Sequence, residues 1–95
     1  MAMDKKTEAA LEVLYKAATN INNEEEARLF FKTLLTEKET QLIAQRLYVA
    51  KLLDESKVYS EIVEETGASS ATVSRVKRAV ATDPEFFEDM LNGVR

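Results

Sequence analysis

The chain has no cysteine and no histidine. Without cysteine it cannot form a disulfide or offer a thiolate to a metal ion. Without histidine it lacks the commonest general base and the commonest metal ligand. Ser/His/Asp and Cys/His catalytic sets are therefore impossible, and no glycine-rich phosphate-binding loop is present. We expect a protein that is not an enzyme and that holds neither a metal nor a cofactor.

Glycine and proline are scarce, with Gly67, Gly93 and Pro84 the only examples in 95 residues. Alanine, leucine, glutamate and lysine are abundant, which favours helices, and strand patterns are absent. The sequence therefore predicts an all-α fold, and residues 1–95 have the length of a single domain. A domain this small buries a modest fraction of its surface, so we expect a homodimer to supply further burial.

Long hydrophobic runs are also missing. Apolar residues make up 45% of the chain, but no run of them is long enough to span a bilayer. The N-terminal segment has no apolar core followed by a small-residue cleavage site, so it does not resemble a signal peptide. These features predict a cytoplasmic protein that does not contact membranes.

Helical periodicity predicts about six helices. Their expected ranges are about 4–20, 23–34, 37–55, 59–66, 70–81 and 84–94. The third helix is apolar around most of its circumference, which is typical of a helix packed centrally. The N-terminal helices 4–33 and the C-terminal helix 84–94 carry more apolar surface than a small core needs. We expect these segments to pack on a second subunit.

Several helix starts have capping residues at the expected spacing. Asn23 with Glu26, and Thr36 three residues before another glutamate, have the spacing of capping boxes. Asp83 and Pro84 are expected to open the last helix, Asp83 as a side-chain cap and Pro84 at the first helical position. These caps predict where the helices begin.

Residues 59–80 have the pattern of a helix-turn-helix. Gly67 lies between two short helical segments, where glycine can take the positive φ that ends the first helix. Ile62 in the first helix and Val73 and Val76 in the second lie where the two helices would pack together. Ser69 is placed to cap the second helix. A helix-turn-helix offers its second helix to the major groove of DNA.

The charge is unevenly distributed along the chain. The formal net charge is -4, which alone is unfavourable for nucleic-acid binding. Between Ala68 and Thr82, however, the only charged residues are Arg75, Lys77 and Arg78. The acidic chain therefore has a local basic patch on the predicted DNA-reading helix.

These residues define a candidate DNA-binding surface. Short side chains at the start of the second helix can approach base edges, and cations further along it can contact phosphates. The candidates are Tyr59, Ser69, Ser70, Ala71, Thr72, Ser74, Arg75, Lys77 and Arg78. For Tyr59 a phosphate contact and simple packing are both open. A plain helical hairpin with a polar surface is the alternative for the whole segment.

The chain resembles the tryptophan repressor family over about residues 34–94. The shared motifs are Ala44 to Arg46, which read Ala-Gln-Arg, and Thr66 to Arg75, which contain Thr-Gly-Ala-Ser. They are most similar to the YerC/YecD-type branch of that family. The resemblance implies an intertwined homodimer with a helix-turn-helix at each end, acting on double-stranded DNA.

The resemblance also implies a candidate ligand pocket. Arg46 and Arg75 fall where tryptophan-responsive members hold the indole, and Thr36 falls at a further ligand contact. Val76 replaces the glycine of those members, and Ala79 replaces their ligand-holding serine. Because a valine side chain excludes other atoms from a close-packed site, we expect Val76 to fill this pocket. An ion pair of Arg46 with an acid such as Glu37 or Glu61 is the structural alternative.

Three functions follow from this pattern. The first is a sequence-specific DNA-binding transcriptional regulator, a repressor that acts as a homodimer without tryptophan. The second is an amino-acid-responsive repressor, with a small-molecule effector that the sequence does not identify. The third is a protein-interaction module that has kept the fold and lost DNA binding, since the net charge of -4 weakens attraction to DNA.

Overall fold

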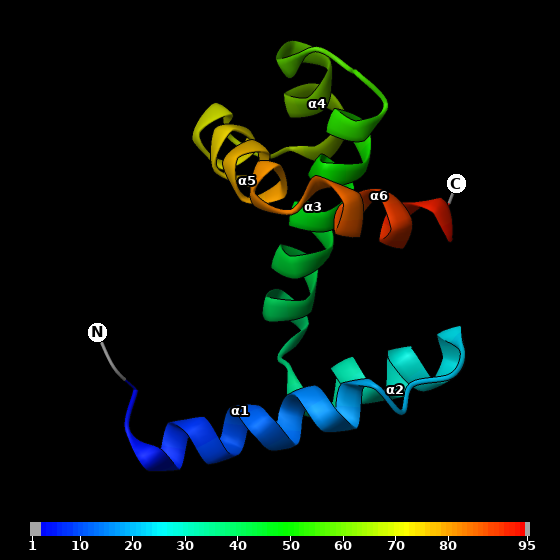
Figure 1. The fold of residues 1–95 in the computed structure, drawn as a ribbon. Helices are drawn as coiled ribbons and strands as arrows, with labels where there is room; N and C mark the ends of the chain where they lie inside the picture. The colour runs from blue at the N-terminus through cyan, green and yellow to red at the C-terminus, as the bar shows by residue number, and fades with distance from the viewer. Residues whose placement is uncertain (1–2, 95) are drawn as a thin grey trace. The chain divides into compact units, whose positions relative to one another are not determined.

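The computed structural model describes residues 3–94, all of whose regular structure is helical. The helices are α1 (Lys5–Ala18), α2 (Glu24–Leu34), α3 (Glu37–Asp54), α4 (Tyr59–Thr66), α5 (Ser70–Thr82) and α6 (Pro84–Asn92) (Figure 1). The predicted all-α fold of six helices is confirmed. Internal contacts divide the chain into two compact units, with the boundary between Thr36 and Glu37.

The first unit is a pair of helices with capped starts. The Asp4 side chain caps α1 by accepting a hydrogen bond from the Thr7 amide at 2.7 Å, and this bond lowers the pKa of Asp4. Asn23 caps α2 by accepting from the Glu26 amide at 2.8 Å, as its spacing predicts. The Glu26 carboxylate in turn accepts from the amide of Asn22, one residue earlier than in a standard capping box.

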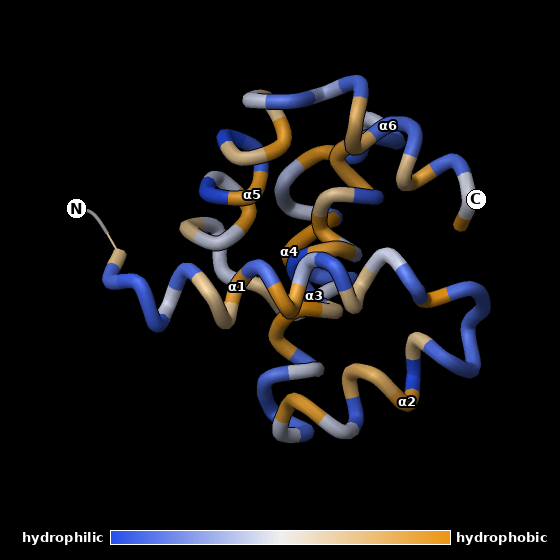
Figure 2. Tube along the Cα trace, turned by 60° about the horizontal axis from the view of Figure 1, so that its bottom comes forward, coloured by the Kyte–Doolittle hydropathy of each residue, from blue (hydrophilic) through white to orange (hydrophobic). Residues whose placement is uncertain are grey.

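Apolar and polar residues are interspersed along the helices of this unit (Figure 2). Neither α1 nor α2 contains a buried residue. Leu29 and Leu34 are both 58% exposed, and Val13 is 69% exposed. A helix pair that buries so little apolar surface needs further surface to cover it.

The second unit holds the core. Helix α3 packs on α4 and α5, α4 packs on α5, and α6 packs on α5. The buried apolar residues form one cluster, made of Val49, Ala50, Leu52, Ile62, Ala68, Val73, Val76 and Leu91. The members from α3 lie toward its C-terminal end, whereas Leu42, Ile43 and Leu47 earlier on the helix stay 46–49% exposed. The expected central position of α3 therefore holds within the single chain for its C-terminal half.

The start of α6 differs from the sequence expectation. Pro84 occupies the first turn as predicted, and Asp83 occupies the N-cap position. The Asp83 side chain makes no capping hydrogen bond, so the expected side-chain cap is wrong. The reason is the backbone, since φ −145° and ψ 70° lie outside the extended region that aims a capping carboxylate at the first turn.

The end of α3 is closed by a Schellman motif with serine where glycine is usual. The Ser56 amide donates to the Leu53 carbonyl at 3.0 Å, and the Lys57 amide donates to the Leu52 carbonyl at 3.1 Å. Ser56 has φ 62°, the one positive φ of a non-glycine residue in the described part of the chain. A side chain in this region costs free energy that glycine does not.

We expect Ser56→Gly to raise the free energy of unfolding by about 1 kcal/mol, because glycine adopts the left-handed conformation without strain. Chemical denaturation of the two proteins measures the difference. Ser60→Gly is the matched control, because Ser60 lies in α4 with helical backbone. It should lower stability, and equal effects of the two substitutions would contradict the assignment of strain to Ser56.

Candidate nucleic-acid interface

Helices α4 and α5 form the helix-turn-helix that the sequence predicts. Gly67 ends α4 in the left-handed conformation, with φ 74°, and its amide donates to the Val63 carbonyl at 2.9 Å. A residue with a side chain at Gly67 would be strained there. Ser69 caps α5, since its hydroxyl oxygen accepts from the Thr72 amide at 3.1 Å. Ala68, between them, is 2% exposed and packs into the core.

A set of hydrogen bonds around Thr66 holds this turn to α3. The Gln45 side-chain amide of α3 donates to the Thr66 carbonyl at 3.1 Å. The Thr66 hydroxyl donates to the Ile62 carbonyl at 2.7 Å and accepts from the Ala68 amide at 3.1 Å. These partly buried bonds fix the end of α4 and the chain direction into α5. Gln45 therefore positions the second helix without being part of its outer surface.

We expect Gln45→Ala to lower the free energy of unfolding by about 1 kcal/mol, because the Thr66 carbonyl loses a partly buried partner. It should also weaken DNA binding, since the turn that orients α5 loses its link to α3, although no charge changes. Denaturation and DNA titration measure the two effects. Gln41→Ala, an exposed change on the same helix, is the control and should leave both unchanged.

The outer face of α5 carries the predicted DNA-binding residues. Val73 and Val76 turn into the core, whereas Ser70, Ala71 and Arg78 are exposed. The exposed candidates are Tyr59, Ser69, Ser70, Ala71, Arg75, Lys77 and Arg78, whereas Thr72 and Ser74 are half-buried. The side chains of these two residues are therefore less accessible than the spacing suggests.

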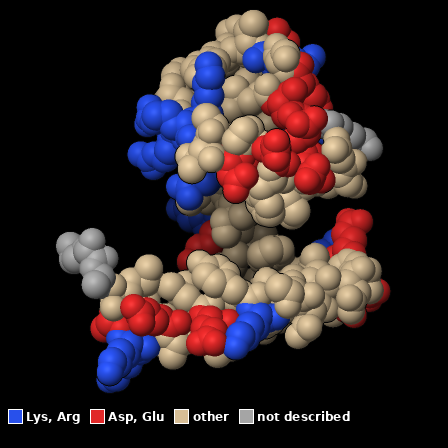
Figure 3. All heavy atoms as spheres, viewed as in Figure 1, with Lys and Arg blue, Asp and Glu red and all other residues tan. Residues whose placement is uncertain are grey.

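Charges of opposite sign separate on the surface of the second unit. Figure 3 shows Lys and Arg side chains gathered on the side where α5 lies, and Asp and Glu side chains on the other edge of the same unit. Arg75, Lys77 and Arg78 remain the only charged residues of α5. Such a local positive surface attracts phosphates even though the chain as a whole is acidic.

Lys77 and Tyr59 form a contact that links α5 to α4. The Lys77 Nζ lies 5.5 Å from the centroid of the Tyr59 ring, within the range of a cation–π interaction. Tyr59 opens α4 and is 36% exposed. The ring therefore lies against a lysine of the candidate surface. The phosphate contact of Tyr59 stays a prediction.

The candidate ligand residues are distributed over both units. Thr36 ends the first unit, and Arg46, Arg75, Val76 and Ala79 lie on α3 and α5 of the second. Val76 is 9% exposed and belongs to the core cluster, whereas Arg46, Arg75 and Ala79 are exposed. Glu61 pairs with Lys57 at 3.9 Å, and an ion pair of Arg46 with an acid stays a prediction.

Comparison with known proteins decides the family. The profile described as Trp repressor protein matches residues 9–94. The chain belongs to the Trp repressor family. It is 40% identical to the uncharacterized protein YerC of Bacillus subtilis (strain 168), over all of this chain and 91% of YerC. The YerC-type branch that the motifs indicate is thereby confirmed.

Solved structures of family members share the fold. A protein from Staphylococcus aureus described as a proposed Trp repressor is 37% identical, covers 98% of this chain and 95% of its own, and superposes with a TM-score of 0.81. A TrpR-like protein from Eubacterium eligens ATCC 27750 is 35% identical and has a TM-score of 0.80. The match covers 90% of this chain and 89% of that protein. The Trp repressor-like fold is confirmed, and the family is one of regulators rather than enzymes.

Two further absences concern the described residues 3–94. None of their helices has the length and apolar character needed to cross a bilayer. No group of three or more Asp or Glu side chains in this range is arranged to hold a metal ion.

Two features of the site are not predicted from the sequence, namely the hydrogen bond between Gln45 and Thr66 and the contact between Lys77 and Tyr59. Gln45 and Thr66 both lie in the motifs that carry the family resemblance, yet their contribution to the turn depends on a contact between residues 21 positions apart. The Lys77–Tyr59 contact likewise joins two helices. Motif spacing identifies such residues, and only the fold shows which partner each one has.

Proposed function

We propose that the protein is a sequence-specific, double-stranded DNA-binding transcriptional regulator, a repressor that acts as a homodimer in the cytoplasm. The observation that carries the proposal is the outer face of α5. It combines a capped start with small exposed side chains, two exposed arginines and a lysine, and no acid. Helix N-termini and short polar side chains suit contacts to bases and phosphates in the major groove.

The roles on this surface follow from position. Ser69, Ser70 and Ala71 begin the helix and would approach base edges, with Thr72 and Ser74 at their side. Arg75, Lys77 and Arg78 would contact phosphates, which position the helix without reading sequence. A single chain offers one such helix, whereas an operator read by two related helices requires a dimer.

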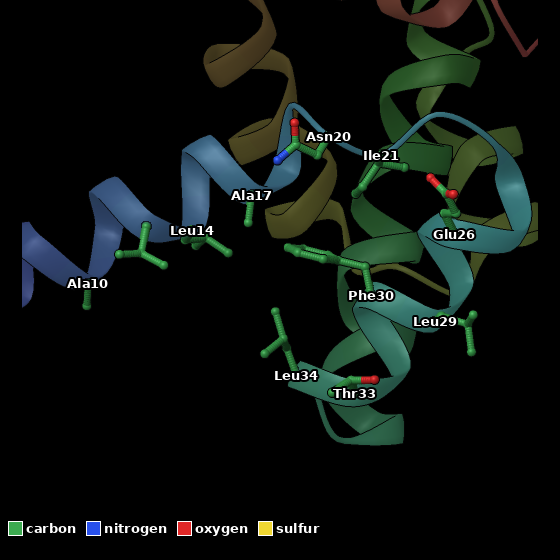
Figure 4. A pocket seen from close by; sticks show the side chains of 11 residues that line it. Ala10, Leu14, Ala17, Asn20, Ile21, Glu26, Leu29, Phe30, Thr33 and Leu34 are labelled. Carbon is green, nitrogen blue, oxygen red and sulfur yellow. The ribbon is translucent and has the colours of Figure 1, made fainter.

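The dimer is supported by the apolar surface that the single chain leaves uncovered. Helices α1 and α2 enclose a groove of about 670 Å³, which is lined mainly by apolar side chains. Figure 4 shows Leu14, Phe30 and Leu34 directed into it from the two helices. In the second unit Leu42, Ile43 and Leu47 of α3 and Phe86 and Met90 of α6 are also exposed.

Soluble monomers rarely leave large apolar patches uncovered. We propose that residues 4–33, residues 37–47 of α3 and residues 84–94 pack on a second copy of the chain. The two compact units would then belong to one intertwined dimeric domain, as in the dimer that the family resemblance implies. Such an interface supplies the burial that a chain of 95 residues lacks on its own.

A salt titration separates this function from a protein-interaction module. A regulator that uses three cations per subunit should lose affinity for genomic DNA fragments steeply as salt rises, because bound phosphates release counterions. A protein-interaction module with the same fold would show no salt-dependent DNA binding. Fluorescence anisotropy with labelled duplexes provides the measurement.

We also propose that DNA binding does not depend on tryptophan. Val76 brings two methyl groups to the position where tryptophan-responsive members have glycine, and it is already part of the core. Ala79 offers no hydroxyl to a ligand ammonium, which leaves that group less satisfied. Calorimetry with L-tryptophan should therefore show no micromolar binding. A micromolar dissociation constant would instead support the amino-acid-responsive alternative, with Thr36, Arg46 and Arg75 as ligand contacts.

A further inference from the structure

Lys77 differs from the ion-paired cations of the chain in the group that holds its ammonium. Its Nζ atom lies 5.5 Å from the centroid of the Tyr59 ring. In the described part of the chain, four other cations pair with a carboxylate four residues away, namely Lys16, Arg28, Lys51 and Lys57. Lys77 has no acid at that spacing, because Val73 precedes it by four residues and Ala81 follows it by four.

A carboxylate and an aromatic ring hold a lysine with different consequences for a second partner. A carboxylate neutralises the ammonium, so a phosphate has to displace it before it can bind the same lysine. The face of an aromatic ring attracts a cation through its quadrupole and carries no net charge. The Tyr59 ring therefore orients the Lys77 ammonium and leaves its charge and its N–H donors to a phosphate oxygen.

Lys77 lies on the part of α5 that is proposed to face DNA. Ser70, Ser74 and Lys77 are spaced by four and then three residues, which places them along one stripe of the helix. Ser70 begins the helix, and Lys77 lies about two turns further on. The ammonium that contacts the ring thus belongs to the same stripe as two candidate base-reading residues.

Tyr59 can hold this lysine because its own position is fixed. It opens α4, and Ile62 in the same turn is 0% exposed in the core. The Ile62 amide donates to the Val58 carbonyl at 3.1 Å, which closes the turn that carries Tyr59. A tyrosine side chain has two χ angles, whereas lysine has a flexible four-carbon stem. The ring therefore restricts the lysine more than the lysine restricts the ring.

We propose that Tyr59 is a positioning residue for DNA binding, which acts through Lys77 and uses its ring rather than its hydroxyl. The inference rests on the proposed function, in which Lys77 contacts a phosphate of double-stranded DNA. A lysine loses rotamer freedom when a phosphate holds it, and this loss opposes binding. Because the ring already restricts Lys77 in the free protein, part of the loss precedes DNA binding. Tyr59 thereby raises the affinity without adding a charge or a base contact.

Two substitutions of Tyr59 separate its ring from its hydroxyl. Fluorescently labelled genomic duplex fragments are a suitable probe, since a phosphate contact does not depend on sequence. Tyr59→Leu should lower the affinity of the dimer about tenfold, or about threefold for each subunit, as expected for an exposed cation–π contact. Tyr59→Phe keeps the ring and should bind like the wild type. Equal losses in the two variants would assign the effect to the hydroxyl and overturn the proposal, and so would a higher affinity of Tyr59→Leu.

A double-mutant cycle shows whether Tyr59 acts through Lys77. In a Lys77→Met background, Tyr59→Leu should cause no further loss of DNA affinity. Lys57→Met is the matched control background, because Lys57 lines the same pocket as Tyr59 and Lys77 but pairs with Glu61 at 3.9 Å. In that background Tyr59→Leu should still lower the affinity about tenfold. The same loss in both backgrounds would show a role independent of Lys77 and overturn the proposal.

The salt dependence of binding separates positioning from charge. Lys77→Met removes one cation from each subunit, so the slope of log affinity against log salt should become shallower by about 2. Tyr59→Leu removes no charge and should lower the affinity with an unchanged slope. An equal change of slope in the two variants would contradict a positioning role.

NMR spectra of the full-length protein without DNA test the contact itself. The ring current of Tyr59 should shift the ε-methylene protons of Lys77 upfield in the wild type and in Tyr59→Phe, and the shift should vanish in Tyr59→Leu. The same spectra show whether each variant is folded. An unshifted Lys77 in the wild type would overturn the proposal. If the wild type binds no DNA, the proposed function fails and this inference fails with it. If the wild type binds DNA and Tyr59→Leu binds equally well, only this inference fails.

Discussion

We expect Arg78→Ala to lower the affinity of the dimer for double-stranded DNA about 100-fold, because one charge-assisted phosphate contact is lost in each subunit. Arg78 is exposed on the side of α5 opposite Val73 and Val76. A phosphate contact carries no sequence information, so every DNA sequence should weaken alike. The dependence of log affinity on log salt should become shallower by about 2, since two fewer phosphates are neutralised.

Arg28→Ala is the matched control for this prediction. It removes the same residue type and the same charge from α2, where Arg28 pairs with Glu24 at 2.8 Å on an exposed helix face. DNA affinity should then change little. Ser70→Ala should behave differently again, by changing which sequences are preferred. If Arg28→Ala and Arg78→Ala weaken DNA binding equally, α5 is not the DNA-binding helix.

We expect Leu47→Glu to raise the dissociation constant of the dimer at least about 1000-fold, because each subunit would place a charge in an apolar interface. Leu47 is 49% exposed in the single chain and follows Leu42 and Ile43 on α3, before the helix reaches its core residues Val49, Ala50 and Leu52. Sedimentation equilibrium should show a monomer for this variant and a dimer for the wild type.

Gln41→Glu controls for the added charge on the same helix. Gln41 is exposed and polar, so the same charge there meets water and should leave the dimer intact. A dimer that survives Leu47→Glu would show that this face of α3 lies outside the interface. If the wild-type protein is a monomer, the proposed dimer is wrong. The expectation that two subunits bind two DNA half-sites is then wrong as well.

The helices and their ends were largely predictable because their signals are local. The periodicity of the apolar residues, the serine that caps α5 and the glycine that ends α4 each act within a few residues. Local signals did not predict the start of α6 correctly. The backbone of Asp83 does not have the extended conformation that a capping side chain requires. At Ser56 the hydrogen bonds of the α3 terminus hold a serine at positive φ, which composition does not indicate.

The candidate site was predictable only in part, for the same physical reason. The spacing of Val73 and Val76 determines which face of α5 turns outward, and hence the exposure of Arg75 and Arg78. The sequence does not indicate that Gln45 holds the turn, or that Lys77 lies over Tyr59, because each contact joins different helices. The apolar residues of α3 predict a central helix, whereas Leu42, Ile43 and Leu47 stay exposed in the single chain.

Selection of bound sequences from random double-stranded DNA tests the central claim most directly. A homodimer that presents α5 from each subunit should enrich pseudo-palindromes whose half-sites lie one helical turn, or a multiple of it, apart. The Arg78→Ala protein should enrich the same sequences at lower yield, and Ser70→Ala should shift the base preference within each half-site. Enrichment of no sequence, or of single half-sites without a repeat, would contradict a dimeric repressor that reads DNA through α5.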